Sequence, residues 1–264
     1  GSQLINPEGS VSIIDLSGGA ANAAVATTVS FDLLDGYEAV LKQAGVALLT
    51  GQTASADIEP EYISVSPDGT RAYVTLQEVN AVAVIDLTDS AATKPLSILP
   101  LGGVDRNLAG NTFDASDRDG PSNGQAIDLR NADVISLLQP DAIATFEVGG
   151  DTYFVTANEG DARVALDDEA TLAEQSGGVF TIDLDDAAYP DEAAMRANAE
   201  LGRLRIRKDL GDTDGDGDID QIYAYGGRSL SIFKQNADGT ITKVRDTGGE
   251  FEAILARDFA TRFN

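Results

Sequence analysis

Residues 62–76 have the sequence YISVSPDGTRAYVTL, in which two apolar runs flank the turn-forming stretch Ser66-Pro67-Asp68-Gly69. Both runs are rich in β-branched and aromatic residues, and Pro-Asp-Gly is typical of a tight turn. A third apolar run, AVAVIDL, follows at residues 81–87. A strand, a tight turn, a second strand, a loop and a third strand together form the pattern of a β-propeller blade.

The end of this pattern recurs, with the sequences VSIIDL, VAVIDL and VFTIDL, at residues 11–16, 82–87 and 179–184. Before the last copy, two more apolar runs occupy residues 142–148 and 153–157, separated by Gly149-Gly150-Asp151. A supersecondary unit that recurs along a chain is the signature of a repeat fold. The repetition therefore predicts a second blade, with residues 178–184 as its third strand.

A third unit is predicted from residue 222 onward, with strands at 222–225 and 230–233 joined by Gly226-Gly227 and a second turn at 236–239. Propellers usually have about four to eight blades of four strands each. We therefore expect an all-β fold, a β-propeller fragment with three to four blades of a ring of about seven. The fragment is expected to form one domain over residues 1–264.

Insertions interrupt the β pattern. Residues 37–49, 191–201 and 251–259 have helix-forming composition and predict short helices. Residues 101–139 are polar and rich in Asp, Asn and Gly, with little periodicity. A loop of that length in a compact domain is usually functional or partly disordered.

The composition restricts the chemistry. The chain has 44 acidic and 18 basic residues, a net charge of −26, and neither cysteine nor histidine. Nucleic acid and anionic membranes are therefore not expected as partners. Disulfides, thiolate or imidazole metal sites and a Ser-His-Asp triad are excluded, so any bound metal must have oxygen ligands. The charge favours calcium-rich or marine surroundings, where cations offset the self-repulsion.

The ends of the chain indicate a fragment. Gly1-Ser2 resembles the remnant of a removed tag, and no signal peptide follows it. No apolar run is long enough to span a membrane. We expect the chain to come from a longer exported protein whose targeting sequence has been removed or lies upstream. Calcium is expected to stabilise this protein in place of disulfides.

One stretch has the spacing of a calcium loop. Residues 212–220 have the sequence DTDGDGDID. Ca²⁺ takes about six to eight oxygens, and carboxylates at relative positions 1, 3 and 5 with glycine at 6 can wrap one ion. Asp212, Asp214 and Asp216 supply those carboxylates, Asp218 a backbone carbonyl at position 7, and Asp220 a ligand at position 9. Tyr223 stands where an EF-hand has its bidentate Glu, so we expect the loop to connect strands and not helices. The alternative is a solvated acidic turn without an ion.

Two weaker cation sites are predicted. Asp114, Asp117 and Asp119 could fold around a second calcium ion, with a flexible polar loop as the alternative. A third set of carboxylates could face the central channel of a propeller and hold cations there, or lie in solvated turns: Glu61, Asp141 and Glu159.

Three arginines are candidates for binding phosphate, because a guanidinium can clamp phosphate oxygens in bidentate geometry: Arg130, Arg163 and Arg228. They could equally form ion pairs with the many carboxylates. A hydrolase without His or Cys would have to use a calcium-bound water, with arginine holding the phosphate and a carboxylate as base. No residue is assigned a catalytic role.

Several stretches together resemble the choice-of-anchor I proteins, a bacterial family of exported propeller proteins related to sea-urchin mesenchyme-specific cell-surface glycoproteins. The resemblance rests on EPEYISVSPDG at 59–69, DASDRDG at 114–120, QPDAIA at 139–144, TANEGDAR at 156–163, LGRL at 201–204, residues 210–220, YAYGGRS at 223–229 and the closing Phe263-Asn264. It covers nearly the whole chain from Glu59, and the first 58 residues match less distinctively. The resemblance implies a β-propeller, export and calcium. Some members are labelled alkaline phosphatase, and the urchin relatives are associated with mineralised skeleton.

The sequence thus favours an exported calcium-binding propeller domain of a cell-surface, extracellular or periplasmic protein. One alternative is a calcium-dependent phosphomonoesterase acting on phosphate esters, and another is an adhesion or mineral-interaction module. The three units that start near Tyr62, Ala142 and Ile222 cannot surround an axis alone, so exposed blade faces predict self-association or missing blades from the parent chain.

Overall fold

The computed structural model describes residues 6–88, 95–163 and 168–262, which form two compact units. The first unit comprises Gly1–Gly102, Gln139–Gly160 and Leu230–Asp246, and the second comprises Gly103–Leu138, Asp161–Ser229 and Thr247–Asn264. Gly1-Ser2 and the closing Phe263-Asn264 lie outside the described residues. The expectation of one domain over residues 1–264 stays a prediction.

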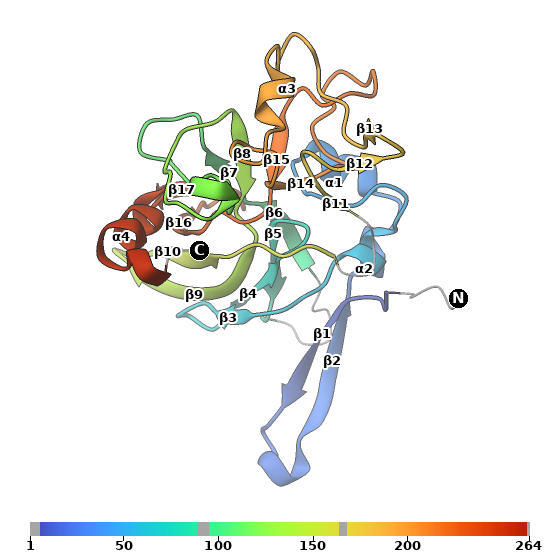
Figure 1. The fold of residues 1–264 in the computed structure, drawn as a ribbon. Helices are drawn as coiled ribbons and strands as arrows, with labels where there is room; N and C mark the ends of the chain where they lie inside the picture. The colour runs from blue at the N-terminus through green and yellow to red at the C-terminus, as the bar shows by residue number, and fades with distance from the viewer. Residues whose placement is uncertain (1–5, 89–94, 164–167, 263–264) are drawn as a thin grey trace. The chain divides into compact units, whose positions relative to one another are not determined.

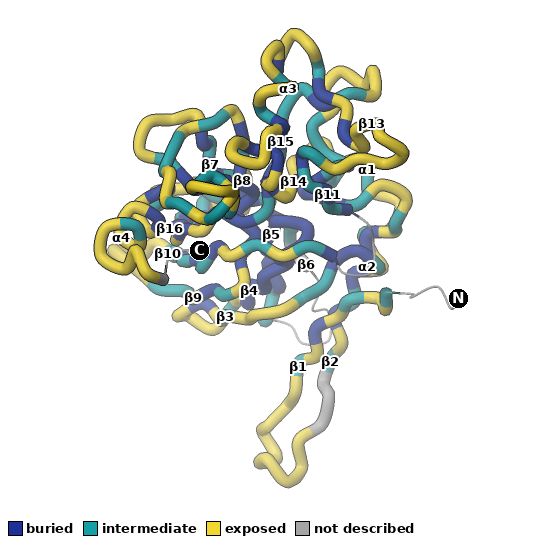
Figure 2. Tube along the Cα trace, in the orientation of Figure 1, coloured by how far each residue is buried: buried dark blue, intermediate teal, exposed yellow. Residues whose placement is uncertain are grey.

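The first predicted blade unit forms a four-stranded antiparallel sheet in the first compact unit (Figure 1). Its strands, in sequence and spatial order, are β3 (Ile63–Val65), β4 (Arg71–Leu76), β5 (Ala81–Asp86) and β6 (Pro95–Pro100). Strand β5 is buried on both faces, and Figure 2 shows it in dark blue. The three predicted strands are confirmed, and β6 adds a fourth.

The turn between β3 and β4 forms through local chemistry. The Gly69 amide donates to the Ser66 carbonyl (2.8 Å), and Gly69 has a positive φ of 72°. The Asp68 carboxylate accepts hydrogen bonds from the Ser66 hydroxyl (2.6 Å) and the Thr70 amide (3.0 Å). Each of these partners lies within two residues of Asp68, so the stretch specifies its own turn.

The hairpin of the second predicted unit is confirmed, but the predicted third strand of that unit is wrong. Strands β9 (Pro140–Val148) and β10 (Asp151–Asn158) pair through the predicted turn. Residues 178–184 do not join them, because β13 (Val179–Phe180) pairs with β12 (Gln175–Ser176) in a separate two-stranded sheet. The sheet is completed instead by β16 (Ser229–Gln235) and β17 (Ile241–Asp246), in the order β17-β16-β10-β9.

The third predicted unit is divided between two sheets. Strand β15 (Ile222–Ala224) pairs in parallel with β8 (Val134–Leu137) and antiparallel with β14 (Arg205–Arg207). Together with β7 (Gly103–Asp105) and β11 (Glu169–Thr171) they form a five-stranded sheet in the second unit. Ile222 joins the core of that unit, whereas Phe233 of β16 packs on Phe154 in the first unit. The strands β15 and β16 are adjacent in sequence but lie in different sheets, because their apolar side chains are buried in different cores.

The remaining elements are short, apart from one hairpin. Strands β1 (Ser10–Asp15) and β2 (Ala24–Ser30) form this hairpin, with Val11 and Val29 buried at its base. Helices lie in all three predicted helical segments: α1 (Glu38–Gln43), α3 (Glu192–Met195) and α4 (Glu250–Asp258). The others are η1 (Ala20–Asn22), η2 (Asp32–Leu34), α2 (Ala54–Asp57), η3 (Pro121–Asn123) and η4 (Ala260–Arg262).

The all-β class is thus borne out, with few helices and several separate sheets. Among the described residues none of these sheets closes on itself, and the propeller stays a prediction. Within residues 6–88, 95–163 and 168–262, no helix has the length and apolar character needed to cross a membrane.

Three aromatic rings link the separate chain segments of the first unit. The Phe154 ring lies 5.4 Å from Tyr73 and 5.1 Å from Phe233, measured between centroids. Tyr73 and Phe154 are fully buried, and Phe233 is nearly so. Since the three residues come from the three stretches that build this unit, the ring stack holds the stretches together.

We predict that Phe154→Ala lowers the free energy of unfolding by about 3–5 kcal/mol, because it removes a fully buried ring and leaves a cavity. Urea denaturation followed by tyrosine fluorescence measures the change. Val148→Ala, at a side chain that is 58% exposed, is the control and should change stability little. Equal losses in the two variants would contradict the role given to the ring stack.

Candidate metal centre

The predicted calcium loop, residues 212–220, connects β14 to β15 in the second unit, and so joins two strands as expected. Its ends are closed by Gly211, whose carbonyl accepts hydrogen bonds from the amides of Asp220 (2.9 Å) and Gln221 (3.1 Å). Gly211, Gly215 and Gly217 all have positive φ, a backbone conformation that favours glycine. The glycines of the sequence pattern therefore fold the loop back on itself.

The first three aspartates of the loop converge. Carboxylate oxygens of Asp212, Asp214 and Asp216 all lie within 4.8 Å of one another, on side chains exposed to solvent. The Asp212 carboxylate also accepts hydrogen bonds from the amides of Gly215 (2.7 Å) and Gly217 (3.1 Å). These backbone bonds hold the first ligand at the centre of the turn.

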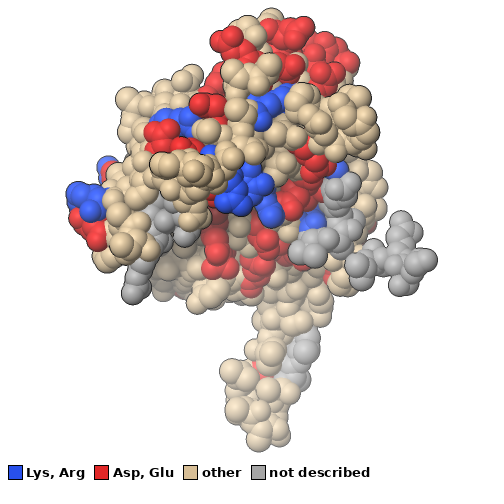
Figure 3. Space-filling view, viewed as in Figure 1, with Lys and Arg blue, Asp and Glu red and all other residues tan. Residues whose placement is uncertain are grey.

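The other two aspartates meet a residue that sequence reasoning missed. Asp218 and Asp220 form a second group with Asp185, again with carboxylate oxygens within 4.8 Å of one another. Figure 3 shows acidic side chains, in red, gathered over the part of the second unit that contains α3 and these loops. The two groups are thus two triads built around one loop.

A short parallel bridge brings Asp185 to the loop. The Ile219 amide donates to the Asp183 carbonyl (3.0 Å), and the Asp185 amide donates to the Ile219 carbonyl (3.2 Å). Leu184 and Ile219 are both buried in the core of the second unit. Two apolar side chains therefore fix the relative position of the two acidic segments.

Loss of hydration and repulsion between carboxylates both act on the second triad. Loss of hydration, the charge of Asp216 and the neighbouring Asp185 and Asp220 raise the pKa of Asp218 to about 6. The Asp218 Oδ1 atom is buried and has no hydrogen-bond partner among the described residues. By contrast, the hydroxyl and amide of Thr213 hydrogen-bond to Asp220 and lower its pKa.

The same repulsion affects the first triad. A hydrogen bond from the Asp216 amide lowers the pKa of Asp214, but the charges of Asp216, Asp220 and Asp212 together with loss of hydration outweigh it, and the net shift is upward. Every ligand candidate in both triads is a carboxylate oxygen, the donor type that Ca²⁺ prefers. The residues present therefore fit a hard divalent cation.

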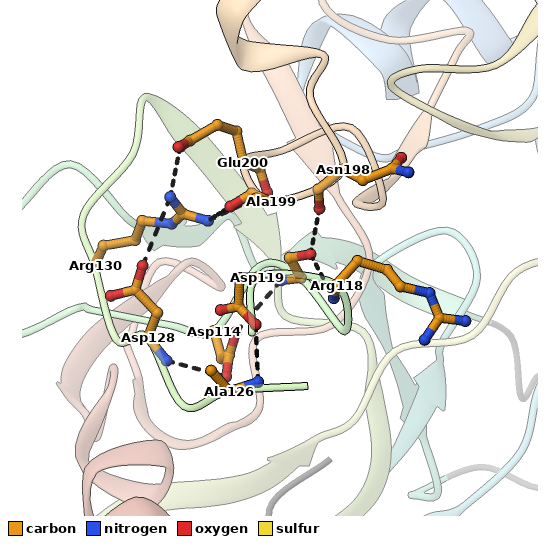
Figure 4. A network of polar contacts seen from close by, with 10 residues as sticks. Asp114, Arg118, Asp119, Ala126, Asp128, Arg130, Asn198, Ala199 and Glu200 are labelled. Atoms are coloured by element: carbon orange, nitrogen blue, oxygen red, sulfur yellow. Dashed lines mark hydrogen bonds and ion pairs between the residues drawn. The ribbon is translucent and has the colours of Figure 1, made fainter. Parts of the chain in front are cut away.

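The second predicted loop is folded differently from a calcium loop. Asp117 forms an ion pair with Arg203 (2.8 Å), and the hydrogen bonds from Arg203 lower the pKa of Asp117. Asp114 is buried, which raises its pKa, and Asp119 accepts a hydrogen bond from the Ala126 amide (3.0 Å; Figure 4). The structure does not bring carboxylate oxygens of Asp114, Asp117 and Asp119 within 4.8 Å of one another. Calcium binding here stays a prediction.

Sequence reasoning also missed Glu252 of α4, which lies beside this loop. Its carboxylate accepts a hydrogen bond from the Asp114 amide (2.7 Å) and pairs with Arg228 (2.9 Å). Only the three-dimensional fold brings Glu252 there, because it is 138 residues from Asp114.

The predicted channel residues all belong to the first unit and are exposed: Glu61, Asp141 and Glu159. The Glu61 amide donates to the Thr75 carbonyl (3.1 Å), and the Glu159 amide donates to the Gln139 carbonyl (3.2 Å). Their carboxylates do not form a group of three within 4.8 Å. A channel site stays a prediction.

Each predicted phosphate-binding arginine has a carboxylate partner. Arg130 pairs with Glu200 (2.5 Å; Figure 4), Arg163 with buried Asp168 (2.9 Å), and Arg228 with Glu252 (2.9 Å). The alternative use of these arginines, ion pairing, is therefore present at all three positions. Phosphate binding at these residues stays a prediction.

A β-rich domain with a strongly acidic loop region is thus the class that the fold and site define. The choice-of-anchor I domain model matches residues 1–264, and the chain belongs to the choice-of-anchor I domain family. Membership in this family implies an exported, surface-associated protein. The family resemblance read from the sequence is thereby confirmed.

The other two comparisons add little. No curated protein matches the chain. Among solved structures, hydrazine synthase from Kuenenia stuttgartiensis is similar over 73% of this chain, at 12% sequence identity and with a TM-score of 0.17. The chain covers 56% of that protein's length, and a likeness at this level carries no argument about fold or function.

We predict that Asp218→Asn raises the melting temperature of the metal-free protein at neutral pH. The raised pKa means that ionised Asp218 disfavours the folded state, a penalty that develops as pH rises from 3.8 to about 6 and is complete above it. The neutral side-chain amide of the Asp218→Asn variant removes this penalty. The advantage of the variant should therefore shrink as pH falls below 6.

Asp238→Asn is the matched control, since hydrogen bonds from Thr240 lower the pKa of Asp238 and its charge favours folding. Scanning calorimetry of chelator-treated protein across this pH range measures both variants. A melting temperature for Asp218→Asn below that of the parent at neutral pH would contradict the electrostatic account.

Proposed function

We propose that this chain is a calcium-binding domain of an exported, surface-associated protein, and that both aspartate triads around residues 212–220 bind calcium. One observation carries the proposal. Five aspartates of one short loop and Asp185 from a separate segment form two groups of three carboxylates, each within 4.8 Å. Grouping so many like charges is unfavourable unless cations neutralise them.

The choice of calcium follows from the ligands. Carboxylates in a glycine-rich loop can adjust to an irregular shell of about six to eight oxygens, whereas Mg²⁺ demands a near-ideal octahedron and retains several waters. The buried Oδ1 atom of Asp218, which has no hydrogen-bond partner among the described residues, is supplied with a partner when a cation binds the second triad. Thiolate and imidazole ligands, which favour zinc, are absent from the sequence.

The position of the loop connects calcium to stability. Ile219 within the loop is buried in the core of the second unit, and β14 and β15 on either side belong to the central sheet of that unit. An ion that holds the loop closed therefore favours the folded state of both strands.

The structure gives less support to the two alternative functions, a phosphomonoesterase and an adhesion or mineral-interaction module. A calcium-dependent phosphomonoesterase needs cationic groups for phosphate, and the three candidate arginines are engaged with carboxylates. An adhesion or mineral-interaction module would use the same acidic surface to bind calcium at an interface. The four-stranded meander β3 to β6 supports a propeller blade. Its edge strand β3 contacts β9 of the other sheet, where the Thr145 amide donates to the Ser64 hydroxyl (2.9 Å). Missing blades or a second copy would therefore pair at the opposite edges, β6 and β17.

We predict that the double variant Asp214→Ala and Asp216→Ala loses one of the bound calcium ions, because it removes two of three ligands of the first triad. Asp185→Asn should weaken the other ion, since it neutralises a ligand of the second triad while Asp218 and Asp220 remain. Isothermal titration calorimetry with Ca²⁺, after exhaustive chelation, gives both stoichiometry and affinity.

The matched control for the double variant is Asp32→Ala with Glu147→Ala, which removes two exposed carboxylates from the first unit. It should bind calcium as the parent does. If all variants bound the same number of ions with the same affinity, the assignment of both triads would be rejected.

We also predict that calcium raises the melting temperature, and more strongly than magnesium does. An ion that binds only the folded state adds about 2.7 kcal/mol at a hundredfold excess over its dissociation constant. Thermal melts with each cation after chelation measure the effect. A calcium titration that left the melting curve of the parent unmoved would rule out this role of the ion.

A further inference from the structure

A cavity of about 280 Å³ lies in the second unit, and none of the residues that line it belongs to either triad. One side is formed by residues 130–133, which lead into β8, and the other by residues 188–191, Met195, Glu200 and Leu201 around α3. All of these residues belong to the same compact unit. Pockets for drug-sized ligands have volumes of about 300–1,000 Å³, so this cavity suits a small molecule.

The floor of the cavity is apolar. Tyr189 and Leu201 are buried members of the core cluster of the second unit, and Met195 packs against that cluster. The Tyr189 hydroxyl already accepts a hydrogen bond from the Ile222 amide (2.9 Å), so its ring is what remains available to a ligand. An aromatic ring favours a neighbouring cation over a neighbouring anion.

Among the described residues that line the cavity, the one basic side chain already has a carboxylate partner. Arg130 pairs with Glu200 (2.5 Å) and donates to the Ala199 carbonyl (2.6 Å; Figure 4). Its charge is therefore shared with a carboxylate, and a phosphate would have to displace Glu200 to reach it.

Two acidic residues that line the cavity have no ion-pair partner among the described residues. Asp133 and Asp191 are exposed, and their carboxylates form no hydrogen bond or ion pair with any described residue. Asp191 precedes α3 without capping it through its side chain. The rim of the cavity thus presents two unpaired negative charges above an apolar floor.

We propose that this cavity binds a small organic cation, an ammonium or guanidinium group carried on a short apolar body. The apolar part lies against Tyr189, Met195 and Leu201, and the charged end lies between Asp133 and Asp191. The cavity shares no residue with the triads but adjoins the second one, because the Ala188 amide donates to the Asp185 carboxylate (2.6 Å), so binding is tested with calcium present.

The test uses three ligands of one shape and different charge: benzylammonium, benzyl alcohol and benzyl phosphate. Ligand-observed NMR titration of the whole chain in calcium-containing buffer measures binding of each. Benzylammonium is expected to bind saturably and to weaken as salt increases, since screening acts on exposed charges. The neutral and anionic analogues are expected to bind at least about tenfold more weakly.

Three variants locate the site. Asp133→Asn with Asp191→Asn should weaken benzylammonium binding about tenfold by removing two exposed ion-pair partners. Ala188→Trp should block the cavity sterically. Asp186→Asn is the matched control, because Asp186 is exposed in the same segment and does not line the cavity, and it should bind as the parent does.

The binding measurements distinguish the proposal from its alternatives. Selective binding of benzylammonium that is lost in the double variant and in Ala188→Trp, but kept in Asp186→Asn, supports the proposal. Tighter binding of benzyl phosphate, equal binding of benzyl alcohol, an unchanged affinity in the double variant, or no saturation at millimolar concentrations overturns it.

Discussion

Positive charge is scarce in this protein, and the use of each arginine determines much of its polar structure. Against 44 acidic residues stand 18 basic ones. Four arginines among the described residues of the second unit are nevertheless buried, Arg106, Arg163, Arg196 and Arg207, and burial of a guanidinium requires matched partners. Arg207 pairs with Asp209 (2.7 Å), Arg106 donates to Ser136 and to the Gly227 carbonyl (both 2.9 Å), and Arg196 donates to the Ile182 carbonyl (2.8 Å). Arg106 in particular connects distant parts of the chain, since Gly227 is 121 residues away.

Many carboxylates that do not pair with arginine lie in one of two environments. Some accept hydrogen bonds from their own turn, as Asp68 does, and their pKa values fall. Others crowd together, as in the two triads, and the pKa of Asp218 rises. In the triads the pKa can rise even where the loop supplies a hydrogen bond, as it does at Asp214, because neighbouring carboxylates and loss of hydration outweigh that bond. The second kind is where a cation has most to contribute.

Features with local causes were predictable from the sequence. The turn at Ser66 to Gly69 and the loop at residues 212–220 follow from residue types and spacing within a few positions, and both connect strands as expected. Strand partners were not predictable in the same way. Nothing in Ile222–Ala224 indicates parallel pairing with β8, because the partner is 88 residues away and register is set by the shared core.

The same limit explains the missed residues. Asp185 directly follows the third Ile-Asp-Leu stretch, which predicts only the end of a strand, and the bridge between Leu184 and Ile219 brings it to the loop. The carboxylate partners of two candidate arginines also come from separate segments, since Glu200 is 70 residues from Arg130 and Glu252 is 24 residues from Arg228. Spacing identifies ligands that belong to one loop, whereas partners contributed by separate segments depend on the fold.

The division of the chain into units has a consequence for synthesis. The chain passes from one unit to the other after residues 102, 138, 160, 229 and 246, so neither unit is a continuous segment. Domains usually fold as they emerge from the ribosome, the N-terminal one first. Here the ring stack of the first unit lacks Phe233 until most of the chain has been made. The first unit is therefore completed only after most of the second has been synthesised, and β10 carries an unpaired edge until β16 follows it.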